Sequence, residues 1–278
     1  MLLGAEILFS TILNLGINGL LLAWGVTPIV LYFIYWYGTR KLKLEKTLAL
    51  LIAAATSVCG VSAAIAVSAA SRAKKEYLTL AISISLIATV LMMVGLPALI
   101  KILGIDYIVG GAWIGGTVDS TGAVVAAGEF LGQEAMEVAA VIKLIQNVLI
   151  GIVAFIVAFF WVKRTKEDYS GSNLGIIQVW YRFPKFIIGF IALSLITSFV
   201  LIPAIGEVRV GNLLKTSKGL RSYFFAMAFI CIGLETNLKE LKKHMFGGKV
   251  VQLYIIGQVF NILLTFLVAW LLFGGVLL

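Results

Sequence analysis

One acidic residue lies in the middle of a stretch of small and apolar residues. Asp119 stands in GAWIGGTVDSTGAVVAAG (111–128), close in the chain to three hydroxyl side chains. A charged side chain at the centre of a membrane helix costs about 2.5–3.5 kcal/mol on insertion scales, so it usually faces a cavity or a partner. A carboxylate among hydroxyls can hold a proton or share a cation, which predicts an ion-binding site here. The hydroxyls are Thr117, Ser120 and Thr121.

A second interpretation of Asp119 is structural. Asp is a good N-cap, and a helix that begins at Ser120 would place Asp119 at that position. The two interpretations are compatible if the helix is broken at Gly115–Gly116, because the acid would then cap a half-helix at the binding level.

Three polar residues share one helix face in VIKLIQNVLIG (141–151). Lys143, Gln146 and Asn147 are spaced by three and four, so their side chains lie on the same side of a helix. A Lys within a span needs a carboxylate or water, and Asp119 is a candidate partner. In the alternative interpretation Lys143 extends to the outer headgroups, since it lies near the start of its segment.

Other candidate ligands lie in two further small-residue segments. Thr56, Ser57 and Ser62 are on TSVCGVSAAIAVSAAS (56–71), and Glu235 ends CIGLET (231–236). Hydroxyls and freed carbonyls suit a hard cation, whereas freed N–H groups at the start of a half-helix suit an anion. The alternatives are close packing of small residues for the hydroxyls and a solvated carboxylate at the inner boundary for Glu235.

The elements that must position these residues are membrane helices. The chain of 278 residues is 61% hydrophobic and only 13% charged, with a mean hydropathy of +1.07, far from the composition of a soluble domain. We therefore predict an all-α polytopic membrane protein with one domain over 1–278 and about 8–9 membrane segments, each near 20 apolar residues. The segments are 12–37, 47–70, 77–100, 110–128, 134–162, 184–203, 218–236 and 248–275, with a partial helix at 1–11.

The first residues and the loops carry information about topology. The chain begins inside an apolar segment with no signal-peptide pattern, so we expect earlier helices to be missing. If 38–46 lies inside and the segments alternate, the inside connectors hold twice as many Lys and Arg as the outside ones. The basic loop SRAKKE (71–76) is then on the wrong side. Either 47–70 does not fully cross, or the loop is a cationic funnel for an anion.

Three segments differ from bulky, lipid-facing ones such as 184–203 and 248–275. Segments 47–70, 110–128 and 218–236 are rich in Gly, Ala, Ser and Thr, which allow close helix packing. We predict that 47–70 and 218–236 are discontinuous and cross near mid-membrane, with 110–128 packed beside them, as in inverted-repeat transporters. The starting points of the two segments are five spans apart, which fits a five-helix unit repeated in inverted topology.

Several of these stretches together resemble the YeiH-type family of bacterial inner-membrane proteins, which are described as candidate sulfate exporters. The family is distantly similar to bile-acid-symporter and cation/proton-antiporter folds. The resemblance implies discontinuous crossing helices, a small anionic substrate and a plasma-membrane location, and it leaves a homodimer open. The stretches are 48–77, 111–128, VIKLIQNVLIG (141–151), RFPKFIIGFIALSLITS (182–198) and FFAMAFICIGLETNLKEL (224–241).

Composition and motifs argue against other functions. The net charge of +9 comes from short connectors between apolar spans, which favours membrane topology over nucleic-acid binding. Cys59, Cys231 and His244 have no metal-type spacing, so we expect no metal and no cofactor. A membrane enzyme is disfavoured because the chain holds no GxGD signature, nucleotide loop or Cys-His nucleophile. A channel is a remote alternative.

The leading hypothesis is therefore a secondary transporter in the lipid bilayer that moves a small anion, such as sulfate or a sulfonate, coupled to H⁺ or Na⁺. The second hypothesis is a cation/proton antiporter in which Asp119 is the exchanged carboxylate.

Overall fold

The computed structural model describes residues 9–164 and 248–275, together with short stretches between 192 and 230. Every regular element in this part of the chain is a helix, as the composition predicts. The elements are α2 (Phe9–Trp36), η1 (Tyr37–Lys41), α3 (Lys46–Ala54), η2 (Ala55–Cys59), α4 (Gly60–Ser71), α5 (Lys75–Leu103), α6 (Tyr107–Thr117), α7 (Thr121–Glu129), α8 (Gln133–Arg164), η3 (Thr197–Leu201), α11 (Ile202–Ile205) and α14 (Lys249–Phe273); η1, η2 and η3 are single π-helical turns.

Five helical segments in the described residues are long and apolar enough to cross a membrane. They match five of the predicted spans closely. The predicted span 218–236 and the connector 163–183 lie almost entirely outside the described residues. The segments are Gly16–Lys41, Lys46–Ser71, Lys75–Leu103, Gln133–Ala154 and Lys249–Phe273.

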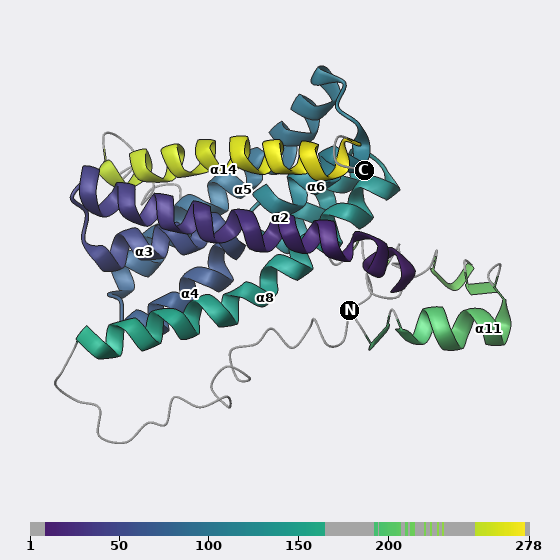
Figure 1. Cartoon of the computed structure of the whole chain (residues 1–278), viewed down its shortest axis with the longest axis horizontal. Coiled ribbons are helices and arrows are strands. Elements are labelled where there is room, and N and C mark those ends of the chain that lie inside the picture. The colour runs from purple at the N-terminus through teal and green to yellow at the C-terminus, as the bar shows by residue number, and fades with distance from the viewer. Residues whose placement is uncertain are drawn as a thin grey trace.

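The first and last described spans form an antiparallel pair along the long axis of the molecule (Figure 1). The Asn18 side chain donates a hydrogen bond to the carbonyl of Leu272 at one end of this pair. At the other end, Gly38 packs against Leu253 so closely that an added Cβ would lie 2.7 Å from its side chain. These contacts fix the two ends of α14 against the two ends of α2.

The segment α3–η2–α4 is a hairpin, which we call the first hairpin (residues 46–71). A straight helix of this length would separate its ends by about 38 Å. Three residues join α4 to α5, and such a link reaches only about 14 Å. Yet the Tyr77 hydroxyl, at the start of α5, donates a hydrogen bond to Glu45 at the start of α3. The chain therefore reverses at Cys59–Gly60, where Gly60 has φ of +29°.

The pair α6–α7 is the second hairpin (residues 107–129). An added Cβ on Gly111 would lie 2.4 Å from the Ala135 carbonyl oxygen, and one on Gly128 would lie 3.3 Å from the same atom. A continuous helix would separate these two glycines by about 26 Å. We had predicted from its length that the segment 110–128 is a single spanning helix, and this prediction is wrong. The segment enters and leaves on the same side.

The two hairpins enter from opposite ends of α5 and meet at their tips. The open end of the first lies beside the start of α5 through Tyr77. The open end of the second lies beside its last turns, where Gly110 packs against Ile100. In between, an added Cβ on Gly60 would lie 2.8 Å from the Ser85 hydroxyl and 3.4 Å from Asp119. Both reversals thus lie deep inside the molecule, between the ends of a helix about 42 Å long.

The expected break at Gly115–Gly116 is wrong in position. Both glycines lie within α6, which ends at Thr117, and the interruption covers 118–120. An added Cβ on Gly115 would lie 2.6 Å from the carbonyl oxygen of Ala139, and one on Gly116 would lie 2.7 Å from Thr265. The glycines therefore let α6 pack closely between α8 and α14 rather than letting the chain bend.

Of the two segments predicted to be discontinuous and to cross each other near mid-membrane, only 47–70 lies in the described residues, so the crossing itself stays a prediction. Segment 47–70 is interrupted as predicted, but it folds back at the interruption rather than crossing the membrane. The neighbour that meets it at the described break is the second hairpin. The predicted partner segment 218–236 lies almost entirely outside the described residues.

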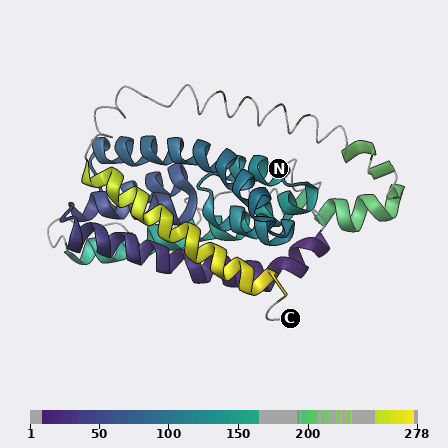
Figure 2. The same ribbon diagram turned by 90° about the horizontal axis from the view of Figure 1, so that it is seen from above.

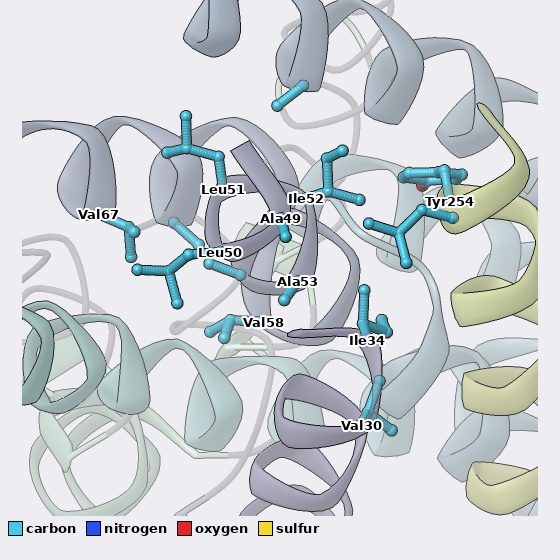
Figure 3. Packing of buried hydrophobic residues seen from close by; sticks show 14 of the residues in the cluster. Val30, Ile34, Ala49, Leu50, Leu51, Ile52, Ala53, Val58, Val67 and Tyr254 are labelled. Carbon is cyan, nitrogen blue, oxygen red and sulfur yellow. The ribbon is translucent and has the colours of Figure 1, made fainter. Parts of the chain in front are cut away.

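The hairpins and α8 supply much of the buried interior, whereas α2, α5 and α14 face outward over much of their length. Residues 48–59 are all buried, and their apolar side chains pack against Val30 and Ile34 of α2 and Tyr254 of α14 (Figure 3). Seen from above, α5 and α14 flank the shorter helices (Figure 2). Helix α14 exposes a row of large apolar side chains, as a lipid-facing helix should: Ile255, Val259, Leu263, Leu267 and Trp270.

Folding back changes the expected sides of two loops. Because the first hairpin returns to its starting side, loop 71–76 lies on the same side as 38–46. Helix α5 then carries 101–109 to the opposite side. Arg72, Lys74 and Lys75 therefore join the basic loop 38–46, which removes the exception that strict alternation produced.

Candidate functional site

The candidate site is built where the two hairpin tips meet. In the first hairpin, Cys59 leaves the helical conformation (φ −152°, ψ 68°) before Gly60, which has a positive φ of +29°. In the second, Val118 and Ser120 are extended on either side of Asp119. Each tip therefore joins the carbonyl end of one short helix to the N–H end of the next. Neither Cys59 nor Ser120 caps the following helix with its side chain.

Asp119 is buried at this junction, with 1% of its surface exposed. Its Oδ2 atom accepts hydrogen bonds from the hydroxyl of Tyr254 on α14 and, at 3.1 Å, from the hydroxyl of Ser85 on α5. Its Oδ1 atom is buried and has no hydrogen-bond partner in the described structure. Asp119 does not cap α7, so the capping interpretation is not what the structure shows.

Lys143 of α8 is buried in the same cluster, with 1% of its surface exposed. Its Nζ atom donates to the Val58 carbonyl oxygen and to Gln146 Oε1, each at 2.6 Å. The side chain therefore does not extend to the headgroups. Lys143 interacts electrostatically with Asp119, but the described residues contain no ion pair between them. The ammonium instead neutralises the carbonyl end of η2, where the helix dipole is negative.

Two amide side chains hold the hairpins together. Gln146 Nε2 lies 3.0 Å from the Ser57 carbonyl oxygen and 3.3 Å from that of Gly116. Asn261 Nδ2 lies 3.2 Å from the Thr56 carbonyl oxygen and 3.5 Å from that of Thr117. Each amide thus bridges one carbonyl from each hairpin, and we call this pair the amide clip.

The orientation of both clip amides is set by their other contacts. Lys143 donates to Gln146 Oε1, and the Thr265 hydroxyl donates to Asn261 Oδ1 at 3.0 Å. Each NH₂ group must therefore face the carbonyls. The clip is physically necessary because interrupted helices at membrane depth free carbonyl groups that lipid cannot satisfy.

Several buried oxygens near the tips remain without partners. Among the described residues these are Asp119 Oδ1, Thr117 Oγ1, Ser57 Oγ, Asn147 Oδ1 and Gln258 Oε1. Buried polar atoms are nearly always hydrogen-bonded in folded proteins. A bound ion, proton or water molecule could interact with these unpaired oxygens, so they mark a candidate binding site.

The structure brings most of the predicted site residues to the tips. Thr117, Asp119, Ser57, Lys143 and Gln146 gather there, as described above. Asn147 donates to the Thr121 hydroxyl at 3.0 Å, and Ser120 is half-buried beside it in the chain.

Three predicted residues stand apart from this group. The Thr56 hydroxyl bonds within its own helix to the Ile52 carbonyl, so only its backbone joins the site. Ser62 is exposed on α4. Glu235 lies outside the described residues.

Sequence reasoning missed two residues that contact Asp119. Tyr254 lies one turn before Gln258 and two turns before Asn261, on the polar face of the last helix, so the helical spacing contained a signal for it. Gln258 and Asn261 donate hydrogen bonds from this face to carbonyls of the two hairpins. Ser85 had no such signal, because single Ser residues are frequent in membrane helices.

The fold and site define a multi-pass membrane protein with two helical hairpins that meet at a buried acid. Comparison with known proteins places the chain in a family. The family model described as "Conserved hypothetical protein 698" matches residues 1–253. The chain belongs to this family, whose members are named UPF0324 membrane proteins and are related to the YeiH-type proteins it resembles.

The similar proteins are bacterial. The chain is 50% identical to a UPF0324 membrane protein of Rhodopirellula baltica over 98% of its length, which is 51% of that relative. It is 51% identical to one of Nitratidesulfovibrio vulgaris, covering 98% of the chain and 48% of the relative. A Clostridium perfringens relative is 30% identical over 90% of the chain and 73% of that protein.

The chain spans about half the length of the first two of these relatives. These findings establish a multi-pass membrane protein of bacteria. No solved structure matches the chain.

Proposed function

We propose that the chain belongs to a secondary transporter that exports a small anion, such as sulfate or a sulfonate, coupled to H⁺ or Na⁺. The observation that carries this proposal is the meeting of two hairpin tips at a buried acid that forms no ion pair with a cationic side chain among the described residues. Irregular backbone at membrane depth is tolerated only where it is buried in protein or lines a water-filled cavity. In secondary transporters, half-helix ends near the midplane hold the substrate and the coupling ion.

The two buried charges have complementary roles in this proposal. Asp119 is the titratable group that exchanges a proton or cation as access alternates between the two sides. Lys143 supplies the positive charge that an anion requires in a low-dielectric site, and it acts either as counter-ion to Asp119 or as anion ligand. The amide clip keeps the two tips in register while the surrounding helices move.

The order of the helices supports an inverted-repeat transporter fold. A hairpin followed by a long helix occurs twice, in 46–103 and in 107–164, and the two hairpins enter from opposite ends of α5. This unit is shorter than the five-helix unit expected from the sequence. We keep the longer repeat as a proposal as well, because 218–236, the discontinuous segment of its second copy, lies almost entirely outside the described residues.

The test is flux into proteoliposomes that contain the purified chain. Radioactive sulfate and a sulfonate are supplied with an imposed pH or Na⁺ gradient. We expect gradient-driven uptake that Asp119→Asn abolishes, while the variant stays membrane-inserted and monodisperse. The control is Glu134→Gln, which removes an exposed carboxylate at the start of α8 and should leave uptake unchanged. Normal, equally pH-dependent uptake by Asp119→Asn would refute the proposed role.

A second candidate is a cation/proton antiporter, which the unpartnered Oδ1 atom of Asp119 specifically favours. An antiporter differs from an anion exporter because a Na⁺ gradient should move protons without any added anion. A pH dye inside the proteoliposomes measures this.

A further inference from the structure

We infer that Asp119, Thr117 and Gln258 form a binding site for one monovalent hard cation, with Na⁺ as the ion that fits. This inference deepens the proposed function, on which it rests, by naming the coupling ion. It starts from three buried oxygens that have no hydrogen-bond partner: Asp119 Oδ1, Thr117 Oγ1 and Gln258 Oε1.

The three residues are brought together by contacts of α14. Tyr254 hydrogen-bonds Asp119, and Gln258, one turn later, places its Nε2 atom 3.4 Å from the Thr117 carbonyl oxygen. Thr117 and Asp119 are two residues apart in the tip of the second hairpin. The oxygens therefore come from the tip and from the helix packed on it.

The chemistry of these atoms favours a cation over an anion. A carboxylate, a hydroxyl and an amide carbonyl are the oxygen ligands that hard cations take. The Gln258 amide cannot be reversed without placing Oε1 against the carbonyl oxygen of Thr117, so an acceptor must stay unpaired. The hydroxyls of Tyr254 and Ser85 already donate to Oδ2, which leaves Oδ1 available.

The charge of the site selects a monovalent ion. No group of three or more His, Cys, Asp or Glu side chains that could hold a metal ion occurs among the described residues. Asp119 is the one carboxylate in this cluster, and the Lys143 ammonium acts on it from α8. With Asp119 and Lys143 both charged, Na⁺ leaves one excess positive charge in this buried site and a divalent ion leaves two, so a monovalent ion is preferred. A proton on Oδ1 would leave the other oxygens without a partner.

The test measures Na⁺ binding rather than transport. The purified chain in detergent is titrated with NaCl at constant ionic strength against KCl and choline chloride, and the Tm and the binding of radioactive sodium are followed. We expect Na⁺ alone to raise the Tm, because a ligand that binds only the folded state stabilises it. Asp119→Asn should abolish both signals.

Conservative variants test the other two ligands. Thr117→Val and Gln258→Ala should each weaken Na⁺ binding by about tenfold, the lower end of the losses seen when a group that supports a metal site is removed. Thr117→Ser keeps the hydroxyl and should bind like the parent. Gln252→Ala, on the exposed side of the same helix, is the control for Gln258.

Protons compete for the same carboxylate, so Na⁺ affinity should fall as the pH falls. The other titratable groups that face this cluster are Lys143, Tyr254 and, beside Lys143, Cys59. Repeating the pH series in Lys143→Met separates a contribution of the ammonium from that of Asp119.

Each outcome decides the inference. Equal effects of Na⁺, K⁺ and choline overturn it, as does Na⁺ binding that is unchanged in Thr117→Val and Gln258→Ala. The failure of the proposed function is distinguishable: Na⁺ binding with no anion flux under any gradient leaves this site standing and refutes the anion exporter. Anion flux that depends on pH but not on Na⁺ supports the anion exporter and refutes the Na⁺ site.

Discussion

At the scale of single residues, the central feature is that the two carboxylate oxygens of Asp119 differ in their hydrogen bonding. Tyr254 and Ser85 both donate to Oδ2, and none of the described residues donates to Oδ1. Hydrogen bonds to a charged group contribute about 1.5–3 kcal/mol each. The two donors therefore hold the carboxylate in one orientation and direct its free oxygen away from them.

Tyr254→Phe tests this positioning. The change keeps the ring, which packs in the core, and removes one donor to Asp119. We expect a lower Tm and a lower maximal rate of gradient-driven uptake, because the carboxylate loses its fixed orientation. The control Tyr107→Phe, at an exposed tyrosine on α6, should change neither. Uptake by Tyr254→Phe with unchanged rate and pH profile would show that the hydroxyl does not position Asp119.

Gly60 is the second residue with a sharp prediction. Its φ of +29° strains any other residue, and an added Cβ would lie 2.8 Å from the Ser85 hydroxyl. Gly60→Ala should therefore destabilise the protein by more than the roughly 1–2 kcal/mol of left-handed backbone alone. Gly104→Ala isolates that backbone contribution, because Gly104 has φ of +64° with open space around it. Equal Tm values for the two variants would contradict the close approach of the tips.

At the scale of elements, the hairpins depend on helices that are distant in the sequence. The carbonyl ends of η2 and α6 are satisfied by Gln146 from α8 and Asn261 from α14. Neither hairpin supplies these donors itself. The interrupted segments therefore become stable at membrane depth only after both long helices have packed on them.

Removing the amide clip should destabilise both hairpins together. Gln146→Leu leaves the Ser57 and Gly116 carbonyls unpaired, and Asn261→Leu leaves the Thr56 carbonyl unpaired while the Thr117 carbonyl keeps its contact with Gln258. Each orphaned group costs about 1–3 kcal/mol. Because the two amides bridge the same two elements, the double variant should deviate from additivity by about 0.5–3 kcal/mol. Thermal unfolding in detergent measures this, with Gln252→Leu as the control. Strictly additive effects would show that the two amides act independently.

At the scale of the whole molecule, the fold-back of both hairpins sets which loops share a side. In the described helices, α2, α5, α8 and α14 run from end to end, while the hairpins return. Loops 38–46 and 71–76 therefore lie together, and the loop at 129–133 lies opposite. The charge bias predicts that the first pair is cytoplasmic.

Cysteine labelling distinguishes this topology from strict alternation. In a background with Cys59 and Cys231 replaced, single cysteines are introduced at Lys41, Lys74 and Glu134, all of which are exposed. An impermeant reagent applied to intact cells should label the cysteine at position 134 and neither of the others. Labelling at both position 74 and position 134 would show that segment 46–71 crosses the membrane, and it would contradict the fold-back of the first hairpin.

The sequence by itself determined the class of protein, its small-residue segments and most of the polar residues at the site. These features are local. Hydropathy fixes which segments enter the bilayer, and helical spacing puts Lys143, Gln146 and Asn147 on one face. The same spacing connects Gln258 and Asn261 and could have added Tyr254. An isolated Asp in an apolar stretch is informative because burying a charge is costly wherever it occurs.

Only the tertiary structure decided that the two interrupted segments fold back and where they do so. Segment 46–71 has the length and hydropathy of a span, so composition alone cannot distinguish a hairpin from a crossing helix. The reversals depend on the backbone at Cys59–Gly60 and at 118–120 and on the amide clip, whose two residues are distant in the chain from the first hairpin. Gly115 and Gly116 suggested a bend, but their neighbours on α8 and α14 use them for close packing instead.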